Sequence, residues 1–159
     1  MPIQPGDRIP EAILKHVDDG IQTLDTRTLF DNRKMVLFAV PGAFTPTCSE
    51  KHLPGFVQHF DAFRARGIEV ACMAVNDPFV MEAWGKDQHV PKGLWMLSDG
   101  NADFSRALGL EIDASGYGMG TRSRRFALYA EDGVVRQLHV EAPGEFRVSS
   151  AEHVLSQLP

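Results

Sequence analysis

The sequence predicts an α/β fold, with a central mixed sheet flanked by helices and an N-terminal β-hairpin. Apolar runs typical of buried strands alternate with helical segments between residues 34 and 108. Two turn signals, Asp18-Asp19-Gly20 and Glu131-Asp132-Gly133, each separate a pair of strand-like segments. The length of 159 residues fits a single domain, residues 1–159, and a hydrophobic content of 43% is enough for a core.

The expected strands are apolar runs, and they cover residues 12–17, 21–24, 34–40, 68–75, 94–97, 125–130 and 134–140. The expected helices begin at residues that cap helices well. They run from Asp25 to about residue 32, from the segment 45–48 to about residue 66, from Asp77 to about residue 88, from Asp99 to residue 108, and from Ser149 or Ser150 onward. Pro54 is expected to kink the second helix, because it lacks a backbone donor.

The segment before Cys48 contains two helix-start signals. Thr47 and Glu50 have the spacing of a capping box, and Thr45 precedes a proline at the first helical position. Both interpretations place Cys48 in the first turn of the helix. A strand, a loop and a helix that begins with a reactive cysteine form the layout of thioredoxin-like folds. Thr45 takes the place of the first cysteine of a Cys-x-x-Cys motif, which excludes dithiol chemistry at this site.

Composition excludes several classes of function. The net charge of −5 argues against binding to nucleic acid or to an anionic membrane. The longest apolar stretch, residues 35–40, is too short to span a bilayer, and residues 1–4 show no signal-peptide pattern. With only two cysteines, we expect a cytoplasmic protein with free thiols. No closely spaced His/Cys set predicts a metal, and we expect no cofactor.

Cys48 has polar neighbours, which is unusual for a cysteine that only fills a core. A free cysteine is only about 3% thiolate at pH 7, and the thiolate is the nucleophile. The first turn of a helix contributes about 0.3–1 kcal/mol to an anion, which is too little alone. We therefore expect one cation beside the sulfur, from Arg122, Arg124 or Arg125, with the others forming a solvated patch.

The segment Pro41-Gly42-Ala43-Phe44-Thr45-Pro46-Thr47-Cys48 resembles the peroxiredoxin signature Pro-x-x-x-Thr-x-x-Cys. The longer segment 41–56, together with residues 75–81 and 124–126, is similar to the type-five (type II) branch of that family. The resemblance covers nearly the whole chain. It implies a thioredoxin-like fold, reduction of hydroperoxides without a metal or organic cofactor, and commonly a homodimer. Phe44 and Phe79 are candidates either for the core or for that dimer contact.

The resemblance also implies roles for individual residues. Cys48 is the expected peroxidatic cysteine, Thr45 is expected to hold the peroxide, and Pro41 to shield the sulfenic acid. Arg125 is the expected thiolate-stabilising arginine. His52 matches a secondary position near the substrate pocket.

Recycling of an oxidised Cys48 needs a second thiol, and the C-terminal segment does not supply one. Some members of the branch carry a resolving cysteine near the C-terminus, but residues 144–149 contain none. Cys72 lies in an expected interior strand and is predicted to be a core residue. We therefore expect a one-cysteine enzyme recycled by glutathione and glutaredoxin. Recycling by thioredoxin, or through a Cys48–Cys72 disulfide, is the alternative.

Two other classes of function remain open at this stage. A cysteine hydrolase would pair Cys48 with a histidine base and form an acyl intermediate. A non-catalytic redox sensor or chaperone would be oxidised at Cys48 without sustained turnover. Neither class explains why Thr45 and Arg125 should accompany the cysteine.

Overall fold

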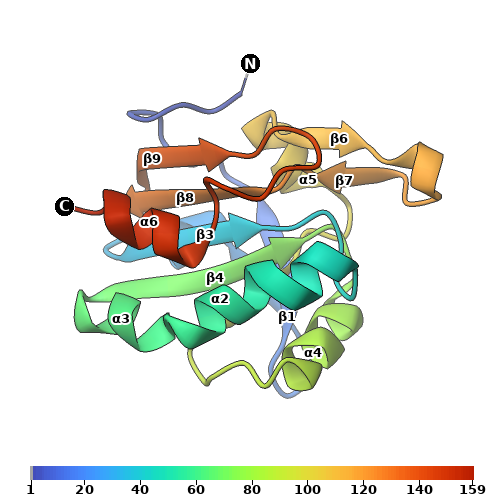
Figure 1. Cartoon of the computed structure of the whole chain (residues 1–159), viewed down its shortest axis with the longest axis horizontal. Helices are drawn as coiled ribbons and strands as arrows, with labels where there is room; N and C mark the ends of the chain where they lie inside the picture. The colour runs from blue at the N-terminus through green and yellow to red at the C-terminus, as the bar shows by residue number, and fades with distance from the viewer. Residues whose placement is uncertain (1) are drawn as a thin grey trace.

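A computed structural model describes residues 2–159. Its centre is a mixed seven-stranded sheet with the strand order β2-β1-β5-β4-β3-β8-β9 (Figure 1). The strands are β1 (Ile13–Val17), β2 (Ile21–Asp25), β3 (Lys34–Ala39), β4 (Ile68–Ala74), β5 (Trp95–Ser98), β8 (Phe126–Glu131) and β9 (Val134–Val140). Strands β3, β4 and β5 are parallel, whereas the two hairpins β1–β2 and β8–β9 add antiparallel strands. The predicted fold class and the N-terminal hairpin are confirmed.

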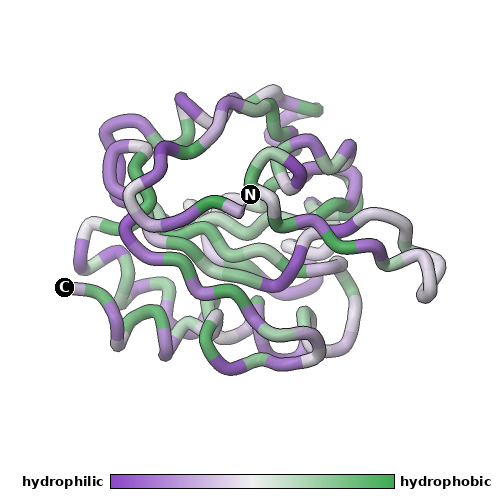
Figure 2. Tube along the Cα trace, turned by 90° about the horizontal axis from the view of Figure 1, so that it is seen from above, coloured by the Kyte–Doolittle hydropathy of each residue, from purple (hydrophilic) through white to green (hydrophobic). Residues whose placement is uncertain are grey.

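Helices cover both faces of the sheet, as the continuous apolar strands require. They are α1 (Thr26–Phe30), α2 (Leu53–Gln58), α3 (Phe60–Ala65), α4 (Pro78–Asp87), α5 (Asp103–Leu108) and α6 (Ala151–Gln157). Alternate residues of β3 serve the two layers: Val36 and Phe38 pack with α2, α3, α4 and α6, and Met35 and Leu37 pack with α1 and α5. Figure 2 shows the hydrophobic sheet enclosed by more hydrophilic segments.

Most helices begin at the expected capping residues. The carboxylates of Asp25 and Asp77 and the hydroxyl of Ser150 each accept a backbone N–H from three residues further on. Asp99 acts from further away, because Ala102, in a left-handed conformation with φ of 63°, is the residue directly before α5. The Asp99 carboxylate nevertheless accepts two N–H bonds from the first turn of α5.

The helix that carries Cys48 begins at residue 46, so the start at Thr45-Pro46 is confirmed. The capping box of Thr47 and Glu50 is wrong: Thr47 already has helical backbone angles, and its side chain makes no capping bond. Pro46 lacks the N–H that a first helical residue would leave unpaired, which favours the earlier start. Cys48 therefore lies within the first turn, as predicted.

The predicted single helix to residue 66 is instead built from three segments. The first is a π-helix, η1 (Cys48–His52), in which the N–H of Leu53 bonds to the carbonyl of Cys48. It passes into α2 just before Pro54, and the break between α2 and α3 falls at His59 rather than at the proline. A wider turn before a proline relieves the clash between its ring and the preceding turn, so the helical backbone continues through Pro54.

A second, two-stranded sheet was not expected. It pairs β6 (Glu111–Asp113) with β7 (Thr121–Ser123), and a 3-10 turn, η2 (Ser115–Tyr117), lies between them. In Figure 1 this ribbon projects from the body at the upper right. Strands of three residues are too short to show an alternating pattern, so the apolar runs of the sequence did not predict them.

Candidate active site

The loop between β3 and the Cys48 helix is held by two specific hydrogen bonds. The N–H of Ala43 donates to the side-chain oxygen of Asn76 (2.9 Å), and the hydroxyl of Thr45 donates to the carbonyl of Gly42 (2.6 Å). Phe44 adopts a left-handed φ of 63° between these anchors and leaves its ring 53% exposed. The loop is thus fixed on both sides of an unfavourable backbone conformation.

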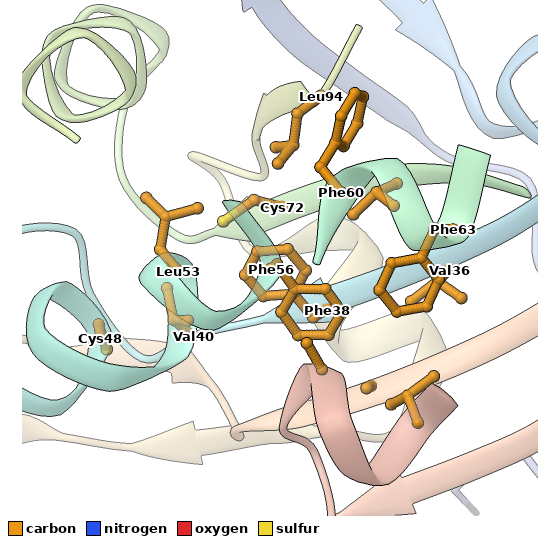
Figure 3. Close-up of a cluster of buried hydrophobic side chains, with 14 of the residues drawn as sticks. Val36, Phe38, Val40, Cys48, Leu53, Phe56, Phe60, Phe63, Cys72 and Leu94 are labelled. Atoms are coloured by element: carbon orange, nitrogen blue, oxygen red, sulfur yellow. The ribbon is translucent and has the colours of Figure 1, made fainter. Parts of the chain in front are cut away.

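Cys48 is fully buried at the start of η1, in a hydrophobic cluster that also contains Val40 and Leu53 (Figure 3). The Nη2 of Arg125 reaches the sulfur and donates to Cys48 Sγ at 3.1 Å. A guanidinium at this distance favours the thiolate over the thiol. Of the three candidate arginines, Arg125, which directly precedes β8, is the one that contacts the sulfur.

The same guanidinium contacts His52. Its Nη1 lies 2.9 Å from His52 Nδ1, and His52 Nε2 lies 3.0 Å from the carbonyl of Ser149. A carbonyl only accepts, so Nε2 carries the hydrogen and Nδ1 accepts from Arg125. Burial and the charge of Arg125 lower the pKa of His52 to about 3, although the bond to Ser149 opposes them. His52 is therefore neutral at physiological pH.

Glu141, directly after β9, holds the backbone segment that contains Ser149. Sequence patterns did not point to this residue. Its carboxylate accepts hydrogen bonds from the N–H groups of Arg147, Val148 and Ser149 and from the hydroxyl of Ser149. Burial alone would raise the pKa of Glu141, but these hydrogen bonds together hold it below its ordinary value. No motif or spacing pointed to an acidic residue 93 positions after Cys48.

A cavity of about 430 Å³ lies beside Arg125, and its lining includes Pro41, Thr47 and Lys51. Of the predicted site residues, Cys48, Arg125 and His52 are joined by hydrogen bonds, and Pro41 lines the adjoining cavity. Thr45 lies in the same loop, but its hydroxyl is bonded to Gly42 rather than to the sulfur.

The two remaining arginines differ from each other. Arg124 is exposed on the rim of the cavity, in agreement with the predicted solvated patch. For Arg122 that prediction is wrong: its Nε donates to the carbonyl of Met119, and its Nη1 is buried. A Cβ added at Gly42 would lie 2.9 Å from the Met119 side chain and 3.6 Å from Arg122 Nη1. Gly42 therefore allows the β7 ribbon to pack closely against the Cys48 loop.

Cys72 differs from Cys48 in its surroundings. It lies in the middle of β4, is fully buried, and is a free thiol. Burial, and next the neighbouring Cys48, raise the pKa of Cys72 well above the ordinary value. In the view of Figure 3, Val40 and Leu53 are drawn between the two cysteines. Cys72 is thus a protonated core residue in this conformation.

Comparison with known proteins identifies the family to which this chain is related. The Redoxin family model matches residues 4–155. The chain is 48% identical to Peroxiredoxin-2E, chloroplastic, of Arabidopsis thaliana over 98% of this chain and 69% of that protein. It is 45% identical to Peroxiredoxin-2B of the same plant over 99% of both. Reduced Prx3 of Vibrio vulnificus in complex with hydrogen peroxide superimposes with a TM-score of 0.93 at 47% identity, covering 97% of this chain and 98% of that one.

The fold and the matching family model define a redoxin domain. The chain belongs to the peroxiredoxin family, whose members are thiol peroxidases, and its relatives are of the type II branch. A Burkholderia cenocepacia protein provisionally called a thioredoxin reductase also superimposes, with a TM-score of 0.98 at 46% identity over 100% of this chain and 99% of that one. That name does not suit the residues here, since Thr45 occupies the place of a second sulfur. Within residues 2–159, no helix is both long and apolar enough to cross a membrane.

Proposed function

We propose that Cys48 is the peroxidatic residue of this thiol peroxidase. Its thiolate attacks the terminal oxygen of a hydroperoxide in line with the O–O bond. That bond breaks, Cys48 becomes a sulfenic acid, and the leaving oxygen takes a proton to become water or an alcohol. The observation that carries this proposal is the 3.1 Å hydrogen bond from Arg125 to the sulfur.

Arg125 has two roles in this proposal, one before the attack and one during it. It stabilises the thiolate before the attack, and it stabilises the charge that builds on the leaving oxygen, as the donors of an oxyanion hole do. Thr45 directs its hydroxyl toward the bound peroxide after exchanging its bond to Gly42, and Pro41 shields the sulfenic acid. A second equivalent of peroxide would convert the sulfenic acid to an inactive sulfinic acid.

The substrates we propose are hydrogen peroxide and alkyl hydroperoxides. The similar Vibrio vulnificus protein has been crystallised with hydrogen peroxide, which supports the smaller substrate. The cavity of about 430 Å³ beside Arg125 is large enough for an alkyl group, which supports the larger ones. Both substrate classes share the O–O bond that the thiolate attacks, and only the leaving group differs.

Glutathione, followed by glutaredoxin, is the recycling system we propose. Residues 144–149 contain no cysteine, and Cys72 is buried and protonated, so an external thiol must reach Cys48. Glutathione would form a mixed disulfide with Cys48, and a second thiol would release it. The alternative is the same peroxidase recycled by thioredoxin, or through a Cys48–Cys72 disulfide after local unfolding of β4.

The test is peroxide turnover with each reducing system at matched concentrations, together with the intact mass of the protein after one equivalent of peroxide. We expect faster turnover with glutathione and glutaredoxin, and a single glutathione adduct on Cys48. The Cys72→Ala variant is the control and should form the same adduct. A dominant internal disulfide without an adduct, or turnover with thioredoxin alone, would contradict the proposal.

We also propose a cytoplasmic homodimer. Phe44 and Phe79 are 53% and 60% exposed; Phe44 lies in the loop before the Cys48 helix, and Phe79 lies in the first turn of α4. Large exposed aromatic side chains of this kind are typical of protein–protein contacts. Sedimentation of Phe79→Asp beside the wild type tests the contact: a wild-type monomer would contradict it.

A further inference from the structure

The side chain of Arg125 is long and has to be held at the sulfur. An arginine with free rotamers loses about 2 kcal/mol of conformational entropy when it is fixed, so neighbouring groups must hold it. Two groups do so here. His52 Nδ1 accepts from Nη1 at 2.9 Å, and the ring of Phe146 lies 5.9 Å from the guanidinium carbon.

The orientation of His52 depends in turn on Ser149. The Ser149 carbonyl accepts from Nε2, and this bond leaves Nδ1 as the acceptor that Arg125 needs. Without that carbonyl, the imidazole could take the other tautomer and turn an N–H toward the guanidinium. The placement of one backbone carbonyl therefore decides whether His52 attracts or repels Arg125.

Ser149 lies in the segment 142–149, which contains no strand or helix. Such a segment needs partners for its backbone N–H groups. The carboxylate of Glu141 supplies them for three successive residues, 147 to 149, at 2.8–2.9 Å, and also accepts from the Ser149 hydroxyl. The N–H of Glu141 donates to the carbonyl of Arg125 at 3.0 Å, so the chain of contacts returns to the residue it supports.

We propose that Glu141 is a positioning residue for Cys48, acting through Ser149, His52 and Arg125. Glu141 makes no hydrogen bond to the sulfur; its carboxylate lies at the lining of the cavity beside Arg125 and bonds to residues 147–149. It places the Ser149 carbonyl, which sets the tautomer and orientation of His52, and His52 holds Arg125 against the thiolate. This inference rests on the proposed roles of Cys48 and Arg125.

If Glu141 acted on Cys48 only through its charge, its removal would change the thiolate fraction in the opposite direction from a loss of positioning. A carboxylate near a thiolate disfavours it, so removal of the charge alone would increase the thiolate fraction of Cys48. Loss of positioning would decrease that fraction, because Arg125 would spend less time at the sulfur. The direction of the change therefore separates the two explanations.

The test is the pH profile of Cys48 alkylation for Glu141→Gln, with Cys72→Ala present throughout so that one thiol reacts. We expect the midpoint of the profile to rise by about one pH unit, and the second-order rate with hydrogen peroxide at pH 7 to fall about tenfold. Glu145→Gln is the matched control: it removes the same charge from the same segment, where the carboxylate pairs with the Arg147 side chain at 4.0 Å and accepts no backbone N–H among the described residues. Its midpoint should stay in place or fall slightly.

A double-mutant cycle shows whether the effect passes through Arg125. In the Arg125→Ala background, Glu141→Gln should no longer shift the midpoint. A shift that persists there, or a downward shift in the wild-type background, would overturn the inference.

If Glu141→Gln does not fold, Ser149→Ala removes only the hydroxyl bond and should give a smaller upward shift; no shift would also overturn it. The alkylation profile needs no peroxide, so a wild type without peroxidase activity would refute the proposed function separately.

Discussion

The two cysteines have the same burial and different chemistry. Cys48 and Cys72 are both fully buried, and both belong to the same hydrophobic cluster. Cys48 lies at the start of a helical segment, with the guanidinium of Arg125 at 3.1 Å. Cys72 lies in mid-strand between Phe38 and Met96 on the neighbouring strands, and burial raises its pKa.

Under the proposed function, burial alone does not decide whether a thiol is reactive. An apolar surrounding disfavours the thiolate at both positions. At Cys48, the guanidinium of Arg125 is directed at the sulfur, and a cavity adjoins that guanidinium. Cys72 is enclosed by residues of the neighbouring strands β3 and β5, so its thiol packs as a small hydrophobic side chain.

The largest expected effect is that of Cys48→Ser. The hydroxyl does not ionise near pH 7, so it cannot act as the nucleophile, and peroxide consumption should fall to background. A peroxide-consumption assay with an excess of thiol reductant measures this. Activity above a few per cent of wild type, after contamination has been excluded, would show that Cys48 is not the peroxidatic residue.

Arg125→Ala should have the next largest effect, because it makes the surroundings of Cys48 resemble those of Cys72. Loss of a directed donor at a reacting centre costs about a hundredfold in rate. The midpoint of the alkylation profile should also rise by about one pH unit. Both quantities are measured by stopped-flow peroxide reduction and by alkylation at graded pH.

Arg124→Ala is the matched control for that substitution. Arg124 is adjacent in sequence but exposed on the rim of the cavity, so its removal should change rate and midpoint much less. If Arg124→Ala has the larger effect, the thiolate is stabilised from the rim and the 3.1 Å contact is not decisive.

Sequence patterns predicted the parts of this site that are local along the chain. The buried strand before the loop and the position of Cys48 in a first helical turn follow from apolar runs and capping residues that lie close together in the sequence. Capping offered two helix starts, and only the structure selected Thr45-Pro46. The need for a cation followed from the chemistry of a thiolate, but the choice of Arg125 came from family resemblance. Spacing alone did not separate it from Arg122 and Arg124.

The remaining parts depend on contacts between distant residues. Ser149 lies 97 positions from His52, and no local pattern predicts that its carbonyl meets the imidazole. Glu141 is one acidic residue among 21 Asp and Glu residues, and only the folded backbone shows that it binds three N–H groups. The π-helix of η1 and the short β6–β7 ribbon lack a distinct hydrophobic period, so pattern analysis could not find them.

The smallest expected effect is that of Cys72→Ser, which completes the comparison. The hydroxyl places a polar group in the core, which costs about 1–3 kcal/mol in the free energy of unfolding. Turnover should stay close to that of wild type, because Cys72 takes no part in the proposed cycle. Cys72→Ala separates the loss of the sulfur from the cost of a buried hydroxyl, since it also lacks the sulfur but adds no polar group. If turnover collapses in both variants while one equivalent of peroxide still yields the Cys48 sulfenic acid, then Cys72 is the resolving thiol. Its burial would in that case describe only the reduced enzyme, and β4 would have to open in each cycle.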